Sequence, residues 1–194
     1  MQEYSYKYKT SDNFDDIILT SEGEYLTGLY FEKSHDLPKH QKEYIYKELP
    51  VFEKTAKWLD IYFSGQIPGF TPSIKINDLT PFRKKVMHIM KTIPYGTVVT
   101  YNEIAKKIAE EMNIEKMSAQ AVGGAVGWNP ICIIIPCHRV VGTNKSLTGY
   151  GGGIKNKKAL LELEKLDISK FKIPIKGNKL WKDAFGVIQI TKHI

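Results

Sequence analysis

An apolar run at 133–135 is followed directly by proline, cysteine, histidine, arginine and valine at 136–140. The three isoleucines of this run predict a short buried strand that ends at the proline. This constrains the fold, because it sets the thiol of Cys137 at the mouth of a packed core. Free cysteine titrates at about 8.5, and its thiolate is the nucleophile. The neighbouring His138 can take up the proton, so the sequence predicts a nucleophilic site, although a free cysteine is more often a small buried hydrophobe.

The composition indicates a globular protein. The chain has 194 residues, 42% of them hydrophobic, enough for one large domain or two small ones. No apolar run approaches the roughly 20 residues of a membrane span. The first residues include an acid and have no apolar core, so a secretory signal is not expected. Cys132 and Cys137 lie around one predicted strand, which makes a disulfide between them sterically awkward. A reducing cytoplasm is therefore the expected location.

The net charge of +7 is distributed unevenly along the chain. Residues 1–78 contain 9 basic and 13 acidic side chains, whereas residues 79–194 contain 19 basic and 8 acidic ones. A basic half beside an acidic half points to an anionic partner for the basic half. The alternative on charge alone is a lysine-rich surface that is simply solvated.

The first half of the chain combines strand and helix patterns. Short runs rich in Tyr, Ile and Leu at 4–8, 16–20 and 25–31 predict strands joined by hairpin turns. Residues 49–64 carry apolar side chains at helical spacing and predict a helix. Residues 66–80 are expected to link this unit to the second half. The apolar face of the predicted helix consists of Leu49, Phe52, Ala56, Leu59 and Phe63.

The second half is mostly helical by its pattern. A helix begins at Thr80-Pro81, because threonine is a good N-cap and proline a good first residue. Further helices are predicted at 101–112, 119–126 and 155–166. A helix, a connection and a second helix, followed by a strand and a glycine-rich loop, predict a helix-turn-helix with a wing.

The Cys-His string and several other segments resemble the O6-alkylguanine-DNA alkyltransferases, which repair DNA by moving an alkyl group from guanine onto their own cysteine. The resemblance covers about Thr80 to Asp167, and its motifs occur in order and at workable spacings. The matching positions are Tyr101, the stretch AVGGA at 121–125, Asn129-Pro130, the block IIIPCHRVV at 133–141, the stretch GYGGG at 149–153, and Glu164.

The resemblance implies an α/β fold with two domains. Residues 1–78 would form an N-terminal sheet-and-helix domain of ribonuclease-H-like topology. Residues 79–167 would form a mostly helical, winged helix-turn-helix-like domain that binds DNA and accepts the alkyl group. Residues 168–194 would be a basic C-terminal extension, which contains Trp181 and Phe185.

The resemblance also implies the reaction. The chain would act in direct-reversal DNA repair as a methylated-DNA–protein-cysteine S-methyltransferase. It would transfer the alkyl group of O6-alkylguanine, with O4-alkylthymine as a second candidate lesion, to its own Cys137, once per molecule. The partner would be double-stranded DNA, bound through the minor groove by a monomer, with the alkylated base rotated out of the stack. No cofactor is implied. A metal site is not expected, because residues 1–78 contain no cysteine and His35 and His40 alone do not make one.

By the same resemblance, five residues take part in the transfer. Cys137 is the alkyl acceptor, and His138 takes up its proton through a bound water. Glu164 holds the imidazole, as the acid does in Ser-His-Asp enzymes. Tyr101 donates a hydrogen bond to the guanine as it leaves, and Asn129 bridges the DNA-binding helix and the active-site strand.

Two further sets of residues would contact the base and the DNA. The alkylated base would be bound by Val140, Tyr150, Gly151, Lys157 and Cys132. The DNA would be contacted by Tyr101, Gln120, Ala121, Gly123, Gly124 and Arg139. Two positions depart from the family pattern: Gln120 replaces an arginine that enters the base stack, and Cys132 replaces a proline of the pocket. Glutamine is uncharged and cannot reproduce that cation.

Three rival functions fit part of the sequence. A non-catalytic sensor of alkylguanine lesions on the same fold would lack the acceptor cysteine, which this chain has. A Cys-His hydrolase would turn over and would need an oxyanion hole, for which the sequence offers no candidate. A winged-helix transcription factor would bind one DNA sequence selectively without any reaction at Cys137.

Overall fold

The N-terminal strands form one mixed sheet. The computed structural model describes residues 2–34 and 44–173. The strands pair in the order β3-β2-β1-β4, with β4 parallel to β1 and the other pairs antiparallel. The strands predicted at 4–8, 16–20 and 25–31 are confirmed to within one residue. The strand bounds are β1 (Tyr4–Tyr8), β2 (Ile17–Ser21), β3 (Leu26–Phe31) and β4 (Ile45–Tyr46).

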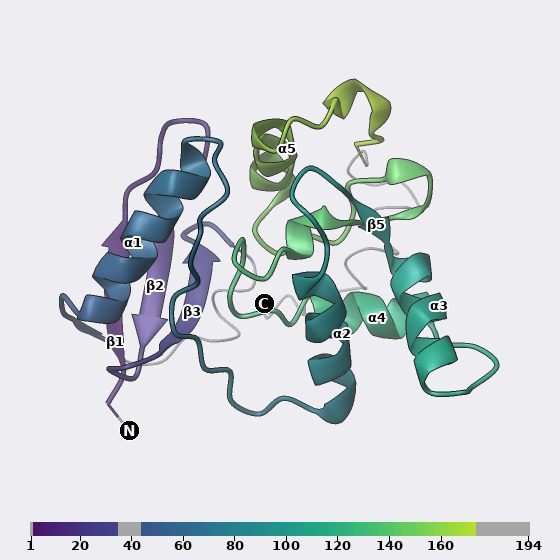
Figure 1. Cartoon of the computed structure of the whole chain (residues 1–194). Helices are drawn as coiled ribbons and strands as arrows, with labels where there is room; N and C mark the ends of the chain where they lie inside the picture. Colours follow the sequence, from purple (N-terminus) through teal and green to yellow (C-terminus); the bar gives the residue numbers. More distant parts are fainter. Residues whose placement is uncertain (1, 35–43, 174–194) are drawn as a thin grey trace, which may run out of the picture.

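Helix α1 (Pro50–Phe63) lies across one face of this sheet (Figure 1). The predicted apolar face is right at Phe52 and Leu59, whereas Ala56 and Phe63 are only half-buried. The buried face of α1 includes Tyr62 instead, because the last turn of α1 also packs against the second half of the chain. The buried side chains of α1 are Val51, Phe52, Thr55, Trp58, Leu59 and Tyr62.

The predicted helices of the second half are confirmed. Helices α2, α3 and α4 pack on one another beside the sheet, and α5 lies above them in Figure 1. Side-chain caps at Thr80, Thr100 and Ser118 begin α2, α3 and α4, because each accepts a hydrogen bond from a backbone N–H of the first turn. The bounds are α2 (Pro81–Lys91), α3 (Tyr101–Glu111), α4 (Ala119–Val126) and α5 (Ile154–Leu163).

Short elements complete this half. Strands β5 (Val99–Thr100) and β6 (Val140–Val141) pair in parallel. Because α3 and α4 lie between them in the chain, they are not the two arms of a hairpin, which would be antiparallel. This pair of strands does not establish the predicted wing, which stays a prediction. The ribonuclease-H-like topology of residues 1–78 also stays a prediction. The 3-10 helices are η2 (Cys137–Arg139), η3 (Thr143–Lys145) and η4 (Ile168–Lys170).

The strand predicted at 133–135 is wrong. Residues 131–135 form a turn, closed by two backbone hydrogen bonds of 2.7 and 3.1 Å. Ile133 adopts a φ of 67°, which is an outlier for a β-branched residue and incompatible with a strand. In so short an apolar run, the pattern cannot distinguish a strand from another buried segment. The burial itself was predicted correctly, since Ile133 and Ile135 are almost fully enclosed.

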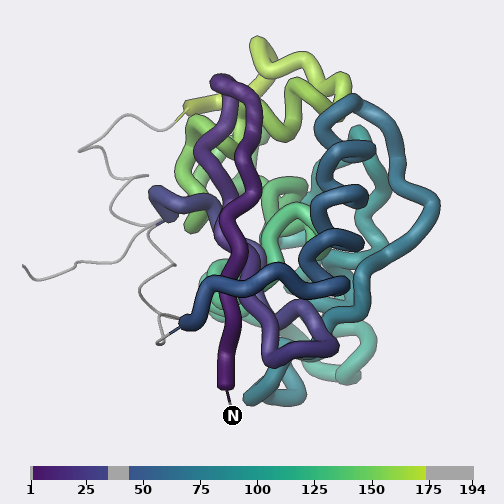
Figure 2. Tube along the Cα trace, turned by 90° about the vertical axis from the view of Figure 1, so that its left-hand side faces the viewer, coloured from purple at the N-terminus to yellow at the C-terminus, as the bar shows by residue number. Residues whose placement is uncertain are grey.

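The two halves of the chain share one hydrophobic core. Leu29 of β3 donates its backbone N–H to Pro130 over 2.8 Å and accepts from the N–H of Cys132 over 3.0 Å. One cluster of buried residues extends from Ile17 to Leu160. Figure 2 shows the purple strands in front of the green segments of the second half. The sheet is therefore tied directly to the turn that precedes the Cys-His string.

Some predictions concern residues that the structure does not describe. His35 and His40, and Trp181 and Phe185 of the basic extension, lie outside the described residues. Within the described part of the chain, no helix combines the length and the apolar character needed to cross a membrane.

Candidate active site

Cys137 opens η2 directly after Pro136 and is only 5% exposed. Its Sγ accepts a hydrogen bond from Nδ2 of Asn129 over 3.0 Å. The same nitrogen donates to the carbonyl of Ile135 over 2.8 Å, and Oδ1 of Asn129 accepts from the N–H of Ile131 over 3.1 Å. Asn129 thus ties the segment after α4 to the turn before the thiol. It also directs a donor at the atom on which a thiolate charge would reside.

His138 is fully buried, and its Nε2 lies 2.8 Å from Oε1 of Glu164. Burial alone would raise the pKa of Glu164, but the hydrogen bonds and charges of His138 and Arg139 lower that pKa to about 2. An ionised carboxylate can only accept hydrogen bonds, so the proton of the neutral imidazole is on Nε2. Nδ1 then carries a free lone pair, and it has no hydrogen-bond partner among the described residues.

The imidazole of His138 is suited to act as a base. Burial lowers the pKa of His138, and the contact with Glu164 opposes this only in part. The positive charges of Arg139 and Lys157 also lower the pKa of the imidazole. The ring is therefore neutral near neutral pH, which is the form that can accept a proton from a thiol.

Glu164 is held by donors from several segments. It follows the last turn of α5 and is 1% exposed. Arg139 binds both carboxylate oxygens, with Nη2 2.8 Å from Oε1 and Nε 2.9 Å from Oε2. The backbone N–H of Gly96 donates to Oε2 over 3.1 Å, and the hydroxyl of Tyr62 donates to Oε1 over 2.7 Å. These contacts fix the carboxylate that orients the imidazole.

Tyr101 begins α3 and directs its hydroxyl at the glycine-rich loop. Its Oη donates to the carbonyl of Thr148 over 3.2 Å. Burial raises the pKa of Tyr101, and the nearby Cys137 adds to this, so the phenol stays a donor at neutral pH. A Cβ on Gly149 would lie 2.6 Å from this Oη, and Gly149 has a φ of 72°. Only glycine permits both the backbone conformation and the close approach.

Lys157 is fully buried behind the same loop. Its Nζ donates to the carbonyl of Val140 over 2.6 Å and to that of Thr148 over 3.0 Å. It also lies 5.8 Å from the centre of the Tyr150 ring. Burial lowers the pKa of Lys157 to about 7. The structure thus brings together Val140, Tyr150 and Lys157, three members of the predicted substrate-binding set.

Gly151 and Cys132, the other two residues of that set, contact the first half of the chain. The carbonyl of Gly151 accepts from the hydroxyl of Ser34 over 3.0 Å, and the N–H of Cys132 donates to Leu29. Cys132 and Cys137 are both buried. Among residues 2–34 and 44–173, no group of three or more His, Cys, Asp or Glu side chains is arranged to hold a metal ion.

Comparisons with known proteins show the family to which this chain is similar. A family model described as "6-O-methylguanine DNA methyltransferase, DNA binding domain" matches residues 81–166. A methylated-DNA–protein-cysteine methyltransferase of Haemophilus influenzae is 39% identical over 150 residues, which make up 77% of this chain and 80% of the relative. The chain belongs to this methyltransferase family.

Solved structures of the family have the same fold. The crystal structure of Mycobacterium tuberculosis O6-methylguanine methyltransferase matches with a TM-score of 0.70 and 34% identity, covering 88% of this chain and 100% of that chain. A crystal structure of OGT from the same organism in complex with DNA matches with a TM-score of 0.68 and 33% identity, covering 88% and 95% of the two chains. The α/β fold class predicted from the sequence is therefore confirmed.

Helix α4 of this methyltransferase presents small side chains to solvent. Gln120, Ala121 and Gly124 are exposed, and Gly123 is half-buried near the ring of Tyr101. A Cβ on Gly124 would meet no atom within 4 Å, so packing inside the protein does not require glycine there. Glycine nevertheless costs a helix about 1 kcal/mol relative to alanine. The small residues leave this face of α4 free to approach another surface closely.

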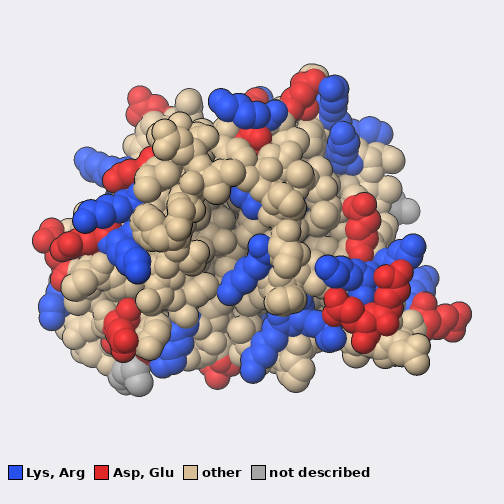
Figure 3. Space-filling model, in the orientation of Figure 1, with Lys and Arg blue, Asp and Glu red and all other residues tan. Residues whose placement is uncertain are grey.

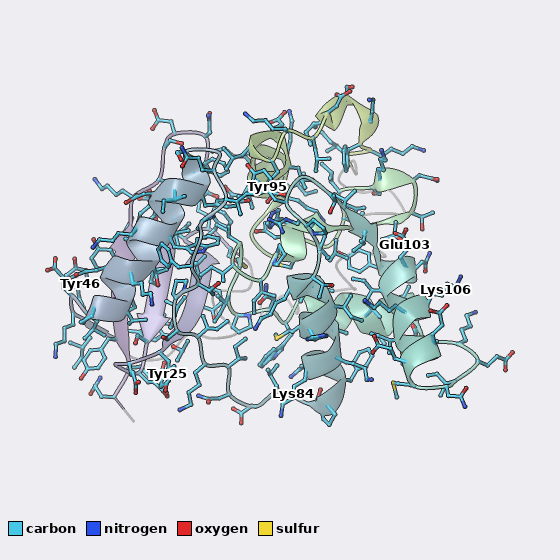
Figure 4. The ribbon with its side chains drawn as sticks, viewed as in Figure 1. Tyr25, Tyr46, Lys84, Tyr95, Glu103 and Lys106 are labelled. Atoms are coloured by element: carbon cyan, nitrogen blue, oxygen red, sulfur yellow. The ribbon has the colours of Figure 1, made fainter. Side chains whose placement is uncertain are left out.

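Basic side chains accompany this half of the methyltransferase. Helix α2 has the sequence PFRKKVMHIMK, which contains no acid. Figure 3 shows Lys and Arg side chains around the middle of the visible face, over α2, and mixed charges near α3. Lys84 and Lys106 project away from α2 and α3 in Figure 4. The basic excess of the second half is therefore exposed to solvent at α2.

Arg139, which was predicted to contact DNA, directs its guanidinium inward. Besides the bonds to Glu164, its Nη1 donates to the carbonyl of Ile93 over 2.7 Å, and the side chain is 11% exposed. The guanidinium also lies 5.7 Å from the centre of the Tyr95 ring. The structure thus assigns this arginine to the buried carboxylate, because an ionised Glu164 needs a counter-charge there.

Tyr62, which α1 carries into the site from the first half of the chain, was not predicted from the sequence. Its hydroxyl lies 2.7 Å from Oε1 of Glu164 and 3.3 Å from Nε2 of His138. No local sequence motif identifies a single tyrosine within a helix as a residue of the site. The available signal is chemical, since a tyrosine on the buried face of a helix requires a partner for its hydroxyl.

Proposed function

We propose that this methyltransferase repairs DNA by direct reversal, moving the alkyl group of an O6-alkylguanine onto Cys137. The observation that carries the proposal is the arrangement around the thiol. Sγ accepts from Asn129, while the neighbouring His138 is fixed through Nε2 by an ionised Glu164 and has a free lone pair on Nδ1. Such a set can form a thiolate in a buried place at neutral pH.

The proposed transfer is an in-line displacement at the alkyl carbon. The thiol of Cys137 gives its proton through a bound water to Nδ1 of His138, and the imidazolium is stabilised by Glu164. A sulfur–carbon bond forms as the carbon–O6 bond breaks, and the bonding pair goes to the guanine. The guanine takes up one proton, which balances the one that the thiol released. The thioether is stable, so each molecule acts once.

The residues around the glycine-rich loop would hold the departing base. The protonated phenol of Tyr101 supplies a hydrogen bond that helps the guanine to leave as a neutral molecule. The carbonyl of Val140 and the ring of Tyr150 would line the pocket with Gly151 and Cys132. Lys157 would fix the loop through its bonds to Val140 and Thr148.

The proposed partner is duplex DNA, contacted in the minor groove by α4. On the exposed face of α4, the small side chains at Ala121 and Gly124 would permit close approach to a groove, with Gln120 beside them. A base inside a stacked pair cannot reach a buried thiol, so the lesion has to rotate outward. We further propose residues 1–78 and 79–167 as the two domains, a monomeric protein, and a cytoplasmic location, because a reducing compartment keeps the proposed acceptor thiol reduced.

The rival functions have less support. A lesion sensor needs a pocket but no acceptor, whereas Cys137 has a hydrogen-bonded thiol beside a fixed imidazole. A sequence-specific transcription factor has no need of that arrangement either.

The test is the intact mass of the protein after incubation with one equivalent of duplex DNA containing O6-methylguanine. We expect one methyl group per molecule, on the peptide that contains Cys137, and no further turnover. The Cys137→Ala variant should bind the DNA without gaining mass. Repeated turnover, methyl on Cys132, or binding without transfer would contradict the proposal.

A further inference from the structure

The last turn of α1 reaches the His138–Glu164 pair through a single buried side chain, Tyr62. This residue is 1% exposed, although it comes from the half of the chain that carries neither the cysteine nor the DNA-facing helix. Its hydroxyl donates to Oε1 of Glu164 over 2.7 Å. The same oxygen of Glu164 accepts from Nε2 of His138 over 2.8 Å.

We propose that Tyr62 is a positioning residue of the Cys137–His138–Glu164 relay, so that the N-terminal half of the chain contributes directly to thiol activation. The hydroxyl of Tyr62 fixes Oε1 of the carboxylate, and Oε1 fixes Nε2 of the imidazole. The orientation of the imidazole ring then sets the direction in which Nδ1 can accept the proton of the thiol. The inference rests on the proposed function, because it assigns a role within the relay that activates Cys137.

The ring of Tyr62 is held so that its hydroxyl has little freedom. It stacks on Trp58 with 5.3 Å between the ring centres and 10° between the planes. Phe63 and Tyr95 contact it edge-on, at 5.7 and 6.1 Å between centres. Aromatic contacts of these geometries are favourable beyond the area that they bury. The position of the hydroxyl is therefore set by the packing of α1 against the second half.

The electrostatics keep Tyr62 a hydrogen-bond donor. Burial raises its pKa well above the ordinary value of 10, and the charge of Glu164 raises it further. The phenol is consequently protonated at neutral pH. Its oxygen also lies 3.3 Å from Nε2 of His138, so its lone pairs reinforce the tautomer that has the proton on Nε2.

Other groups that face the relay limit the size of the effect. The charged or titratable neighbours are Arg139 of η2, Lys157 of α5, and Tyr95 in the segment after α2. Arg139 holds both oxygens of Glu164, and the N–H of Gly96 holds Oε2, independently of Tyr62. Loss of the hydroxyl should therefore misalign the imidazole for part of the time and leave the carboxylate in place.

The Tyr62→Phe variant tests this role, because it keeps the aromatic packing and removes only the hydroxyl. We expect the reaction of Cys137 with free O6-benzylguanine at pH 7 to slow by about tenfold, less than the 10²–10⁴-fold that a general base contributes. The midpoint of its pH–rate profile should move up, toward the ordinary thiol value of about 8.5. A purely structural role would leave this midpoint unchanged, because a midpoint does not depend on the amount of folded protein.

Tyr95→Phe is the matched control. Tyr95 belongs to the same aromatic cluster and lies beside the last turn of α5 (Figure 4). Its hydroxyl bonds to the carbonyls of Leu163 and Gly65, at 3.0 and 3.4 Å, and not to the carboxylate. This control variant should keep the pH midpoint of the wild type.

The measurement uses the full chain, with O6-benzylguanine and iodoacetamide in parallel from pH 6 to pH 9, and the adduct on Cys137 followed by mass spectrometry. A wild type that is labelled by iodoacetamide but gains neither benzyl from O6-benzylguanine nor methyl from O6-methylguanine DNA would contradict the proposed function. The iodoacetamide midpoints would still test Tyr62 in that case. The positioning role is overturned if the Tyr62→Phe midpoint stays at that of Tyr95→Phe or moves down.

Discussion

The side-chain amide of Asn129 lies 3.0 Å from the Sγ of Cys137 and donates a hydrogen bond to it. The same side chain makes two further buried bonds to the backbone of the turn before the thiol. One residue thus shapes the turn and also points a positive hydrogen at the reacting atom. These two roles predict that its loss affects folding and reaction together.

Asn129→Ala should lower both the unfolding free energy and the rate of alkyl transfer. Removing a buried partner leaves groups unsatisfied, at a cost of about 2–4 kcal/mol in total. The transfer should slow by at least about tenfold, since a lost bond to a charged group is worth about 1.5–3 kcal/mol. Urea unfolding and single-turnover rates measure the two effects. Asn102→Ala, at an exposed side chain bonded to Thr143 over 3.3 Å, is the control. An unchanged rate would show that the amide does not act on the sulfur.

The adjacent Cys137 and His138 are enough to predict a nucleophilic thiol with a base beside it from the sequence. The α/β elements follow from periodicity and caps such as Thr80. The backbone at Ile133 could not be predicted in this way. A run of three isoleucines specifies burial, while its turn conformation depends on pairing between Leu29 and its partners across the fold.

The surroundings of Glu164 show a second limit of sequence reasoning. Arg139 follows His138 directly in the chain and was expected to meet DNA, yet it pairs with the carboxylate. Tyr62 reaches the same carboxylate from 102 positions earlier in the chain. Such contacts arise when two halves pack together, and no local spacing encodes them.

Glu164→Gln tests the ionisation of the buried carboxylate. The pKa of Glu164 is lowered from 4.5 to about 2 by its partners, against the effect of burial. A carboxylate with a depressed folded pKa stabilises the fold above its ordinary pKa, and this contribution is lost as the pH falls toward 2. Between pH 5 and 2 the wild type should therefore lose on the order of 3 kcal/mol more unfolding free energy than the variant.

Urea unfolding at a series of acidic pH values measures this difference. Glu162→Gln is the control, because Glu162 is an exposed acid of the same helix that pairs with Lys158 at 3.7 Å. Its pH dependence should parallel that of the wild type. Parallel curves for Glu164→Gln as well would mean that Glu164 is not held ionised by its neighbours.

Lys157 predicts a second pH dependence of stability, in the alkaline range. Burial lowers its folded pKa from 10.5 to about 7. The unfolded chain therefore binds more protons than the folded one between these values, and stability rises with pH there. Relative to Lys157→Met, the wild type should gain on the order of 3 kcal/mol of unfolding free energy between pH 7 and 9.5. Lys158→Met, at the partly exposed neighbouring lysine, should show no such relative change. If the wild type shows no such gain relative to Lys157→Met either, the pKa of the Lys157 amine lies near its ordinary value.

Gly124→Ala separates the stability of α4 from its proposed contact with DNA. An added Cβ meets no atom of the protein, so the helix should gain about 0.5–1 kcal/mol of unfolding free energy. The same methyl group would project toward the minor groove and should weaken binding to duplex DNA. Thermal unfolding, a DNA titration and the rate with free O6-benzylguanine distinguish the effects. If the variant is more stable and binds DNA as well as the wild type, this face of α4 does not enter the groove.

By the resemblance drawn from the sequence, Gln120 stands where the family pattern has an arginine, and it is exposed at the start of α4. An arginine at this place would fill the gap left by the rotated base and would offer charge to nearby phosphates. Glutamine can fill the gap and form hydrogen bonds, but it has no charge, so extrusion of the base should be weaker than an arginine would give. Gln120→Arg should therefore raise the transfer rate on duplex DNA, and Gln120→Ala should lower it. Neither change should alter the rate with free O6-benzylguanine, which needs no extrusion. Parallel changes of the duplex and free-base rates would place the effect of Gln120 at the chemical step, because only a residue acting on extrusion distinguishes the two substrates.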